Sequence, residues 1–419
     1  MADQSTHGSV TTLDDESWDP FELFDRAMGS DTCRDPYPDF AAARGQAPIQ
    51  KIDLVKLMGE AAMALGSKVP DVYVASSYAA VSEVLRDGKR FSSSAYKDTI
   101  GLVMGPTILV MDEPEHGRYR SLIQLAFRTK ALQKWEHDLV RPIVHGYVDA
   151  FAARGSADLV RELTFPFPVY VIAGLLGLPH EDLPRFHRWA VGLISVAFDF
   201  ANGLAAAKKL GEYLTPIIEA RRAHPKDDII SVLTQAELEG TRLDNEHILG
   251  FLRLLLPAGA ETTYRSSSNL IFGLLTHPEQ LEAVRRDRAL IPRAMEEALR
   301  WEAPLTGIGR LCTEDTEVCG VKIPRGAMVQ VSLGAANHDE TRWEEPTKFD
   351  IFRPPKQHMA FAFGPHRCLG MDLARMETDV VINAVLDRLP NVRLDPAADD
   401  VHITGRIFRA PRRLPVLFG

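Results

Sequence analysis

A long helical pattern near the middle of the chain constrains the fold more than any other feature of the sequence. Asp244 is typical of a helix N-cap, and apolar residues recur at helical spacing from there to about Thr276. At 1.5 Å per residue, such a helix would be roughly 48 Å long. It is therefore long enough to cross a whole domain.

The centre of this predicted helix breaks the rules of helix formation. Pro257 removes the backbone hydrogen bond to the carbonyl of Arg253, and Gly259 costs about 1 kcal/mol relative to alanine. Places where local rules fail are often functional sites. Small residues leave room for a planar ligand against the helix, and Glu261 and Thr262 offer an acid and a hydroxyl beside the widened groove. The alternative is a packing kink in which the Thr262 hydroxyl bonds back to the helix.

Helical periodicity dominates the first three quarters of the chain, whereas strands and loops follow Trp301. The loop-rich stretch from Asn337 to Cys368 is long enough to indicate a functional segment. We therefore expect a mainly α fold with small β-sheets (α+β). The other predicted helices are 78–86, 114–127, 138–154, 182–196 and 228–238, the last ending at Gly240, and the predicted strands are 72–75, 318–323 and 328–332.

The organisation of the chain favours a single folded domain. A length of 419 residues alone suggests two or three domains, but no repeat, low-complexity linker or clear boundary divides the sequence. Residues 1–19 are rich in Ser, Thr and acidic residues, and they lack the basic and apolar regions of a signal peptide. We expect 1–19 to be a disordered tail and 20–419 to be one domain.

Charge and cysteine content narrow the functional classes. The net charge is 48 − 57 = −9, a sign that argues against nucleic acid or an anionic membrane as the main partner. The most apolar stretch, 169–179, is too short to span a bilayer. The four cysteines lie far apart without a C-x-x-C pair, which is too sparse for a disulfide framework or a four-thiolate zinc site. We therefore expect a cytoplasmic protein.

The most informative short segment is 361–370, which is followed directly by a helix-like run. It places Cys368 at a helix N-terminus, where the helix dipole and free backbone N–H groups stabilise a thiolate. Gly364 and Gly370 allow the backbone to approach whatever the sulfur binds. Such a thiolate is a metal ligand or a nucleophile. A half-buried structural cysteine beside a turn is the alternative.

Two further groups of polar residues are candidates for a functional role. Glu297 and Arg300 lie three residues apart on one face of a predicted helix, and Arg353 follows in a loop. Alone, such a pair is usually a solvated ion pair worth under about 1 kcal/mol. His116 and Arg120, at i and i+4, put two donors suited to carboxylates or phosphates on one helical face. A solvated helix face is the alternative there.

Four segments, those around His116, Glu261, Glu297 and Cys368, together resemble motifs of the bacterial soluble cytochromes P-450, the haem-thiolate monooxygenases. The resemblance runs from about Trp18 to Gly419 and is most specific between Gly259 and Gly370. It implies the fold of that family, a triangular helical bundle around a central long helix, with haem buried between this helix and the cysteine loop. The sequence departs from the family's pattern at Ala362, because a glycine is common at this position after the aromatic residue, here Phe361.

The resemblance also implies a role for each motif. The cysteine at the Cys368 position is the fifth ligand of haem iron and favours O–O cleavage. Glu261 and Thr262 match the acid-alcohol pair that delivers protons during dioxygen activation. Two propionates in a low-dielectric interior need matching cations and donors. The implied haem contacts are His116, Arg120, Ala258, Gly259, Arg310, Phe361, His366 and Gly370, and the implied buried triad that holds the scaffold of the cysteine loop is Glu297, Arg300 and Arg353.

By the same resemblance, the substrate pocket is mostly apolar. An apolar lining with few polar anchors suits a hydrophobic small molecule such as a terpenoid, aromatic, steroid or fatty compound. We expect the enzyme to hydroxylate or epoxidise such a molecule. The implied lining is Leu102, Met104, Leu254, Leu305, Thr306, Ile308, Ile407 and Phe408.

The family also implies cofactors and partners. The cofactor is haem b and the co-substrate is dioxygen. Two electrons per turnover come ultimately from NAD(P)H through a separate ferredoxin and ferredoxin reductase, because the sequence carries no flavin- or ferredoxin-like segment. We expect a monomer. Five cations on the cysteine side of such a fold are either a basic patch for an acidic ferredoxin or solvated surface charges, namely Arg128, Lys130, Lys134, Lys356 and Arg367.

Three other functions compete with this one. A haem-binding sensor or carrier would bind haem through Cys368 equally well, but the intact pair of Glu261 and Thr262 argues against it. An enzyme of the same fold that uses peroxide or rearranges its substrate typically lacks that pair. A zinc protein using His366 and Cys368 fails for want of two more nearby ligands.

Overall fold

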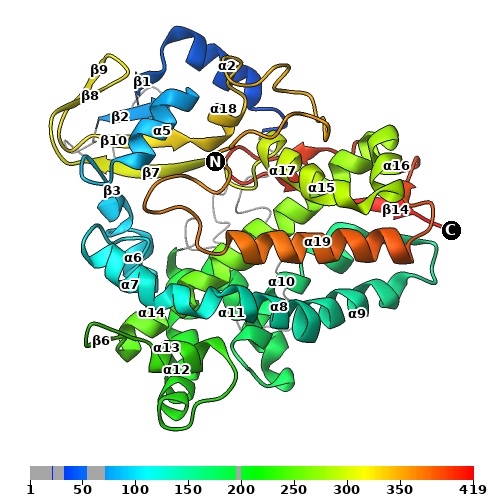
Figure 1. The fold of residues 1–419 in the computed structure, drawn as a ribbon, viewed down its shortest axis with the longest axis horizontal. Coiled ribbons are helices and arrows are strands. Elements are labelled where there is room, and N and C mark those ends of the chain that lie inside the picture. Colours follow the sequence, from blue (N-terminus) through cyan, green and yellow to red (C-terminus); the bar gives the residue numbers. More distant parts are fainter. Residues whose placement is uncertain (1–20, 22–32, 54–70, 195–199) are drawn as a thin grey trace, which may run out of the picture.

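The computed structural model describes residues 21, 33–53, 71–194 and 200–419, so the predicted tail, 1–19, lies outside the described residues. Helices make up most of the molecule, and the largest sheet lies at one end of it (Figure 1). The predicted mixture of helices and small sheets is confirmed. Helices that recur below are α5 (Tyr78–Arg86), α6 (Ile100–Met104), α7 (Glu115–Gln124), α8 (Thr129–Trp135), α11 (Leu183–Ile194), α12 (Phe200–Ala223), α13 (Ile229–Gln235), α17 (Ile291–Trp301) and α18 (Leu333–Asn337).

The long helix that the sequence predicts is present and ends at Thr276. Asp244 is its N-cap, and the Asp244 carboxylate accepts a 2.8 Å hydrogen bond from the backbone N–H of His247. Pro257 cannot donate to the preceding turn, and a wider turn interrupts the regular ladder there. The disrupted centre is therefore a π-bulge. The three parts of the helix are α14 (Asn245–Leu256), the π-helical turn η9 (Pro257–Glu261) and α15 (Thr262–Thr276).

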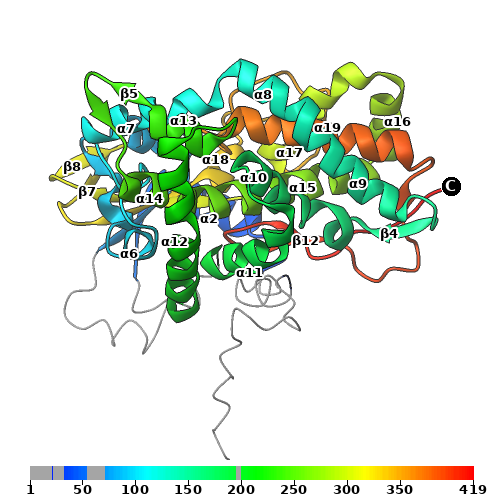
Figure 2. The same cartoon turned by 90° about the horizontal axis from the view of Figure 1, so that it is seen from below.

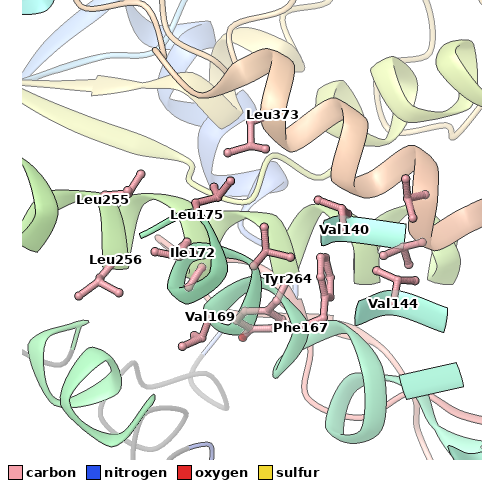
Figure 3. Close-up of a cluster of buried hydrophobic side chains, with 14 of the residues drawn as sticks. Val140, Val144, Phe167, Val169, Ile172, Leu175, Leu255, Leu256, Tyr264 and Leu373 are labelled. Atoms are coloured by element: carbon pink, nitrogen blue, oxygen red, sulfur yellow. The ribbon is translucent and has the colours of Figure 1, made fainter. Parts of the chain in front are cut away.

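The long helix packs between α10 (Phe167–Leu175) and α19 (Met371–Arg388) (Figure 3). Leu373 of α19 and Ile172 of α10 belong to one buried hydrophobic cluster with Leu255 of α14. A Cβ on Gly259 would lie 3.0 Å from Ile172 Cδ1, so this glycine lets α10 pack closely against the π-helical turn. This packing determines where the disrupted turn lies relative to the first turn of α19.

The largest sheet has the strand order β1-β2-β10-β7-β3 (Figure 1). In this sheet, β10 (Met328–Ser332) pairs parallel with β2 (Val72–Ala75) and antiparallel with β7 (Gly307–Cys312). Because side chains alternate along a strand, Ile308 and Arg310 of β7 lie on the same face. Apart from β8 (Thr316–Val318) and β9 (Val321–Ile323), the remaining strands are β1 (Ile49–Ile52), β3 (Phe91–Ser92), β4 (Ser156–Asp158), β5 (Glu237–Leu238), β6 (Thr241–Arg242), β11 (Arg393–Leu394), β12 (Ile403–Thr404), β13 (Ala410–Pro411) and β14 (Pro415–Leu417).

Two local predictions are wrong, and glycine turns explain both. The helix predicted to end at Gly240 ends at Gln235, and a two-stranded hairpin follows, with Gly240 at φ +75° in its turn. The strand predicted over 318–323 is instead a hairpin of β8 (Thr316–Val318) and β9 (Val321–Ile323). Its two turn residues, Cys319 and Gly320, have φ +48° and +83°, as the tightest hairpin turns require.

On another side of the long helix, α12 crosses α14 (Figure 2). The short helix α6 packs against both α12 and α14, and α11 packs along α12. Three helices, α6, α11 and α12, therefore pack against α14, the first part of the long helix. In the part of the chain that the structure describes, no helix is both long and apolar enough to cross a membrane.

Candidate active site

Cys368 lies at the end of the loop that leads into α19. Its backbone N–H donates a 2.9 Å hydrogen bond to the carbonyl of Phe361. Gly364 has φ +73°, and a Cβ there would clash with the carbonyl oxygen of Leu85 in α5. Gly364 therefore allows the loop to contact α5, whereas no atom lies within 4 Å of the position that a Cβ on Gly370 would take. Of the two glycines, only Gly370 leaves space next to the cysteine.

The Cys368 side chain is exposed and free of a disulfide. Partial desolvation by the protein that surrounds the open side of Cys368 raises the pKa of its thiol, whereas the Gly370 N–H and Arg120 lower it. The N–H at the start of α19 therefore favours the thiolate, as expected, while desolvation favours the thiol. A metal ion would deprotonate the thiol on coordination. Within the described residues, no group of three or more His, Cys, Asp or Glu side chains is arranged to hold a metal ion.

The centre of the long helix presents its residues to two different environments. Ala258 is exposed and Thr262 is half-buried, whereas Glu261 is only 3% exposed. The Thr262 hydroxyl donates a 2.7 Å hydrogen bond to the carbonyl of Ala258. Glu261 forms an ion pair with Arg265, one turn further along the helix. Thr262 is thus bonded back to the helix, as the alternative interpretation holds, and the Glu261 carboxylate is buried in its ion pair with Arg265.

The residues expected to bind the haem propionates come together from α7, β7 and the cysteine loop. The rings of His116 and His366 pack against each other, with centroids 3.9 Å apart. Arg120 Nη2 donates a 2.6 Å hydrogen bond to the carbonyl of Arg367. Arg310 is buried, and its Nη1 donates to the carbonyl of the preceding residue over 2.7 Å. Burial lowers the pKa of His366 to about 3, and the positive charge of nearby groups contributes.

This cluster is rich in donors and poor in acceptors. Burial lowers the pKa of both Arg120 and Arg310, and within the described residues neither forms an ion pair with a carboxylate. His116 is only 1% exposed, and its Nε2 has no hydrogen-bond partner, whereas its Nδ1 lies 3.0 Å from Glu113 Oε1. Buried donors without partners cost free energy. The cluster is therefore complementary to an anionic group.

Glu297, Arg300 and Arg353 form a buried ion-paired group. Glu297 Oε1 accepts hydrogen bonds from Arg300 Nη2 at 2.7 Å and from Arg353 Nε at 3.3 Å, and its Oε2 accepts one from Arg300 Nε at 2.8 Å. Arg300 also donates to the carbonyls of Asn337 and Lys348. The group therefore ties α17 to the loop-rich stretch that follows α18, and its burial rules out a solvated surface pair.

The predicted pocket residues lie on separate elements, and several face open space. Leu102 on α6 is 63% exposed and Ile407 is 51% exposed. The backbone N–H of Thr306 donates to the Ile407 carbonyl over 2.8 Å, and Leu305 pairs with Phe408 as an isolated β-bridge. The structure therefore brings 305–308 and 407–408 together. The Thr306 hydroxyl is buried in this contact, Met104 is buried, and Leu254 and Ile308 are half-buried.

Arg253 of α14 is missing from the predicted site, although it is next to Leu254. Its Nε and Nη2 donate to the carbonyl of Ala207 on α12 over 3.1 Å and 2.9 Å. The available signal is a lone cation inside the apolar run 251–256. Helical spacing alone does not show which neighbours that cation meets.

The five cations considered as either a basic patch or solvated surface charges are all exposed. Lys134 of α8 is already paired with Asp227 at 2.7 Å and with Asp138 at 3.4 Å. Lys356 and Arg367 line a hollow of about 550 Å³ together with Phe361. Two of the five cations therefore border one hollow beside the cysteine loop.

Comparisons with known proteins agree on one family. The family described as cytochrome P-450 matches residues 199–411. Over 330 residues the chain is 35% identical to cytochrome P-450 CYP107DY1 of Priestia megaterium, covering 78% of this chain and 80% of that protein. It is 33% identical over 398 residues to a vitamin D(3) 25-hydroxylase of Pseudonocardia autotrophica, covering 92% and 94%. The crystal structure of CYP109E1 from Bacillus megaterium in complex with testosterone aligns with a TM-score of 0.82 at 32% identity, covering 92% and 99%.

Proposed function

The chain belongs to the cytochrome P-450 family of haem-dependent monooxygenases, and from this premise we propose that Cys368 is the ligand of the haem iron. The proposed reaction is hydroxylation or epoxidation of a hydrophobic small molecule. The observation that carries the proposal is the exposed Cys368 thiol at the N-terminus of α19, in a chain that also brings together two arginines without carboxylate partners and a buried His116 Nε2 without a hydrogen-bond partner.

The residues present fit a haem. A haem carries two propionates, and the cluster of His116, Arg120 and Arg310 supplies two cations without carboxylate partners and one buried ring nitrogen without an acceptor. His366, stacked on His116, is the fourth proposed contact. A haem iron also needs an accessible protein ligand, and the exposed Cys368 sulfur would supply a thiolate. We therefore assign the propionates to this cluster.

Haem, when bound, supplies the redox chemistry that activates dioxygen. Along the long helix, the proposed haem contacts are Ala258, which is exposed, and Gly259. The missing Cβ of Gly259 lies against Ile172, so this glycine would act by holding α10 close to the π-helical turn. Phe361 and Gly370 would contact the haem from the cysteine loop.

We assign the control of protons to Thr262 and Glu261. The Thr262 hydroxyl is bonded to the Ala258 carbonyl, and rotation about its Cα–Cβ bond would redirect the proton toward the pocket. Glu261 is buried and paired with Arg265, so this ion pair must loosen before the carboxylate can exchange a proton with water. Thr262 would therefore present the proton, and Glu261 would replace it.

The group of Glu297, Arg300 and Arg353 has a positioning role in this proposal. Arg300 and Arg353 bind carbonyls of the loop-rich stretch, and that stretch leads directly into the cysteine loop. Removal of one charge would leave its partner buried and uncompensated. The group would thereby keep Cys368 at a constant position.

Separate redox proteins would supply the electrons. A ferredoxin, reduced by a ferredoxin reductase with NAD(P)H, is the proposed donor. The exposed cations Arg128, Lys130, Lys134, Lys356 and Arg367 would favour an acidic partner. Because Lys134 is already neutralised by two aspartates, Lys356 and Arg367 beside the hollow should contribute most. We also propose that the protein works as a monomer in the cytoplasm, where its four free cysteines would stay reduced.

The substrate is proposed to be hydrophobic and of steroid or lipid size. Apolar side chains dominate the predicted pocket, and Leu102 and Ile407 are exposed. A related enzyme is named a vitamin D(3) 25-hydroxylase, and a similar structure contains testosterone. Both names support a substrate of this size.

The carbon monoxide difference spectrum of the reduced protein tests the proposed function. Thiolate ligation predicts a strongly red-shifted band in protein purified with its haem. Turnover of a hydrophobic substrate with NAD(P)H and a surrogate ferredoxin system then tests catalysis. A red-shifted band without any product across a broad substrate library would favour the sensor or carrier.

A further inference from the structure

Arg253 lies where α14, α12 and the end of α6 meet. Its Nε and Nη2 donate to the carbonyl of Ala207 on α12. Gly211 makes room for the guanidinium, because a Cβ there would lie 2.5 Å from Nη2, and Gly105 lies next to the guanidinium, because a Cβ there would lie 4.0 Å from Nη1. Gly105 follows the last residue of α6, Met104. The side chain is therefore held in one position between three elements.

The positive charge of Arg253 has no counter-charge in contact with it. Within the described residues, no carboxylate lies at ion-pair distance from Arg253, and the acid that influences it electrostatically is Glu246, seven residues away. The partly buried Arg253 differs in this respect from buried Arg221 and Arg300, which are paired with carboxylates at 2.5 Å and 2.7 Å. Burial accordingly lowers the pKa of Arg253. A partly desolvated cation without an anion costs free energy that an anionic ligand would recover.

The free donors of Arg253 suit a carboxylate. A guanidinium has five N–H donors. The Ala207 carbonyl uses the Nε donor and one Nη2 donor, which leaves one donor on Nη2 and both on Nη1. These remaining donors form the end of the fork, which binds a carboxylate through two parallel hydrogen bonds.

The position of Arg253 relates this charge to the predicted substrate pocket. Arg253 directly precedes Leu254, which is expected to line the pocket. Leu102 and Met104, which are also expected to line it, lie on α6. The backbones of α14 and the end of α6 are close, because a Cβ on Gly250 would lie 3.3 Å from the Met104 carbonyl oxygen. Along the long helix, Arg253 is nine residues before Thr262, which corresponds to about 13 Å.

We propose that Arg253 binds the carboxylate of the substrate, so that the natural substrate is a hydrophobic acid. Its carboxylate and the carbon that is oxidised would be separated by about 13 Å, the spacing between Arg253 and Thr262 along the helix. A medium-length fatty acid and a fused-ring acid both meet this requirement. This inference rests on the proposed function, because it assigns the substrate class of the same pocket.

A structural role for Arg253 is the competing explanation. In that case the side chain would only link α14 to α12 through the Ala207 carbonyl. Loss of the link would weaken the binding of every ligand to a similar extent. Loss of a carboxylate site would weaken the binding of acids alone.

Calorimetric titration of the purified haem-containing protein with matched acids and methyl esters separates the two explanations. The probes are dodecanoic acid, lithocholic acid and the methyl ester of each. Wild type should bind at least one acid about tenfold or more tighter than its ester, as expected for a charge-assisted pair of hydrogen bonds. Arg253→Gln, which keeps a donor for Ala207, and Arg253→Leu should both lose this preference.

Arg222→Gln is the matched control. Like Arg253, Arg222 is a half-buried arginine, but it lies on α12. It donates to the Leu243 carbonyl at 3.0 Å and to Asn245 Oδ1 at 2.9 Å. Its loss should leave the ratio of acid to ester affinity unchanged. A wild-type protein that prefers neither acid, or an acid preference that survives in both Arg253 variants, would overturn the inference. Failure of the proposed function would appear separately, as the absence of the red-shifted carbon monoxide band in wild type.

Discussion

The hydroxyl of Thr262 donates a 2.7 Å hydrogen bond to the carbonyl of Ala258, within the turn that the π-bulge disrupts. A hydroxyl held in this way has one proton and two possible recipients, the helix carbonyl and a polar group in the pocket. The half-buried position of Thr262, with Ala258 exposed beside it, is what makes the second recipient possible.

Replacement of Thr262 by alanine should uncouple electron consumption from product formation. The variant keeps haem, ligand-induced spectral shifts and electron uptake, but it lacks the proton that the hydroxyl supplies. We expect the product formed per NAD(P)H to fall by about tenfold or more, with hydrogen peroxide in its place. The assay measures NAD(P)H, peroxide and product with a surrogate ferredoxin system. Thr262→Ser should retain most of the coupling, and wild-type coupling in Thr262→Ala would remove this residue from the mechanism.

Glu261→Gln provides a contrast within the same assay. The amide keeps the shape of the side chain but cannot relay a proton. Turnover should therefore slow, with less diversion to peroxide than in Thr262→Ala. Glu261→Asp, which keeps the carboxylate, should be faster than Glu261→Gln.

Breaking the buried group around Glu297 should destabilise the protein strongly. Glu297→Ala leaves Arg300 and Arg353 without their shared carboxylate, which costs about 3–5 kcal/mol in the free energy of unfolding. Urea unfolding and haem content measure the effect. The exposed pair of Glu282 and Arg286, 2.9 Å apart, is the control, because Glu282→Ala should cost less than about 1 kcal/mol. Equal effects of the two substitutions would contradict the assigned role.

Ala362 should be replaceable by glycine with a gain in stability. Its φ of +56° lies in the left-handed region, which is unfavourable for an L-residue by about 1 kcal/mol. Ala362→Gly should therefore raise the free energy of unfolding by about 0.5–1 kcal/mol. Ala374→Gly, inside α19, should lower it by about 1 kcal/mol. A loss of stability in both variants would show that the Ala362 methyl group contributes more through packing than it costs in strain.

His187 should make the protein sensitive to acid. Burial, with a contribution from Arg188, lowers the pKa of this residue from 6.5 to about 4, and its Nε2 has no hydrogen-bond partner. The folded state therefore binds the proton less readily than the unfolded state. The resulting stability is complete above pH 6.5 and is lost as the pH falls toward 4.

We expect this loss to be on the order of 2 kcal/mol, because the side chain is only half-buried. Unfolding in urea at pH 7 and pH 4.5 measures it. His187→Phe should reduce the difference between the two pH values, whereas His137→Phe, at a highly exposed position, should not. An unchanged difference in His187→Phe would mean that other groups cause the acid sensitivity.

The sequence was sufficient for elements whose signals are local. Asp244 caps the long helix as predicted, and the helix ends at Thr276 just before Pro278, because caps and prolines act on neighbouring residues. The strand 328–332 is present with the predicted bounds. Gly240 shows the limit of such signals, because a glycine ends a helix and forms a hairpin turn equally well.

The sequence was insufficient where the outcome depends on tertiary neighbours. The partner of Thr262 depends on whether the helix or the pocket offers the better acceptor, which no local pattern contains. The pKa of the Cys368 thiol depends on the balance between desolvation, which raises it, and the Gly370 N–H and Arg120, which lower it. The sequence presents Arg253 as a lone cation in an apolar run, and its contacts with Ala207 of α12 and with Gly105 after α6 depend on tertiary packing.

The most direct test of the account is the carbon monoxide difference spectrum of Cys368→His beside wild type. Wild type should show the red-shifted band of a thiolate-ligated haem, and Cys368→His should lose that band while retaining haem through the imidazole. Cys319→Ser, at an exposed cysteine in the β8–β9 turn, is the control and should keep the band. Retention of the red-shifted band in Cys368→His would contradict the assignment of Cys368 as the iron ligand.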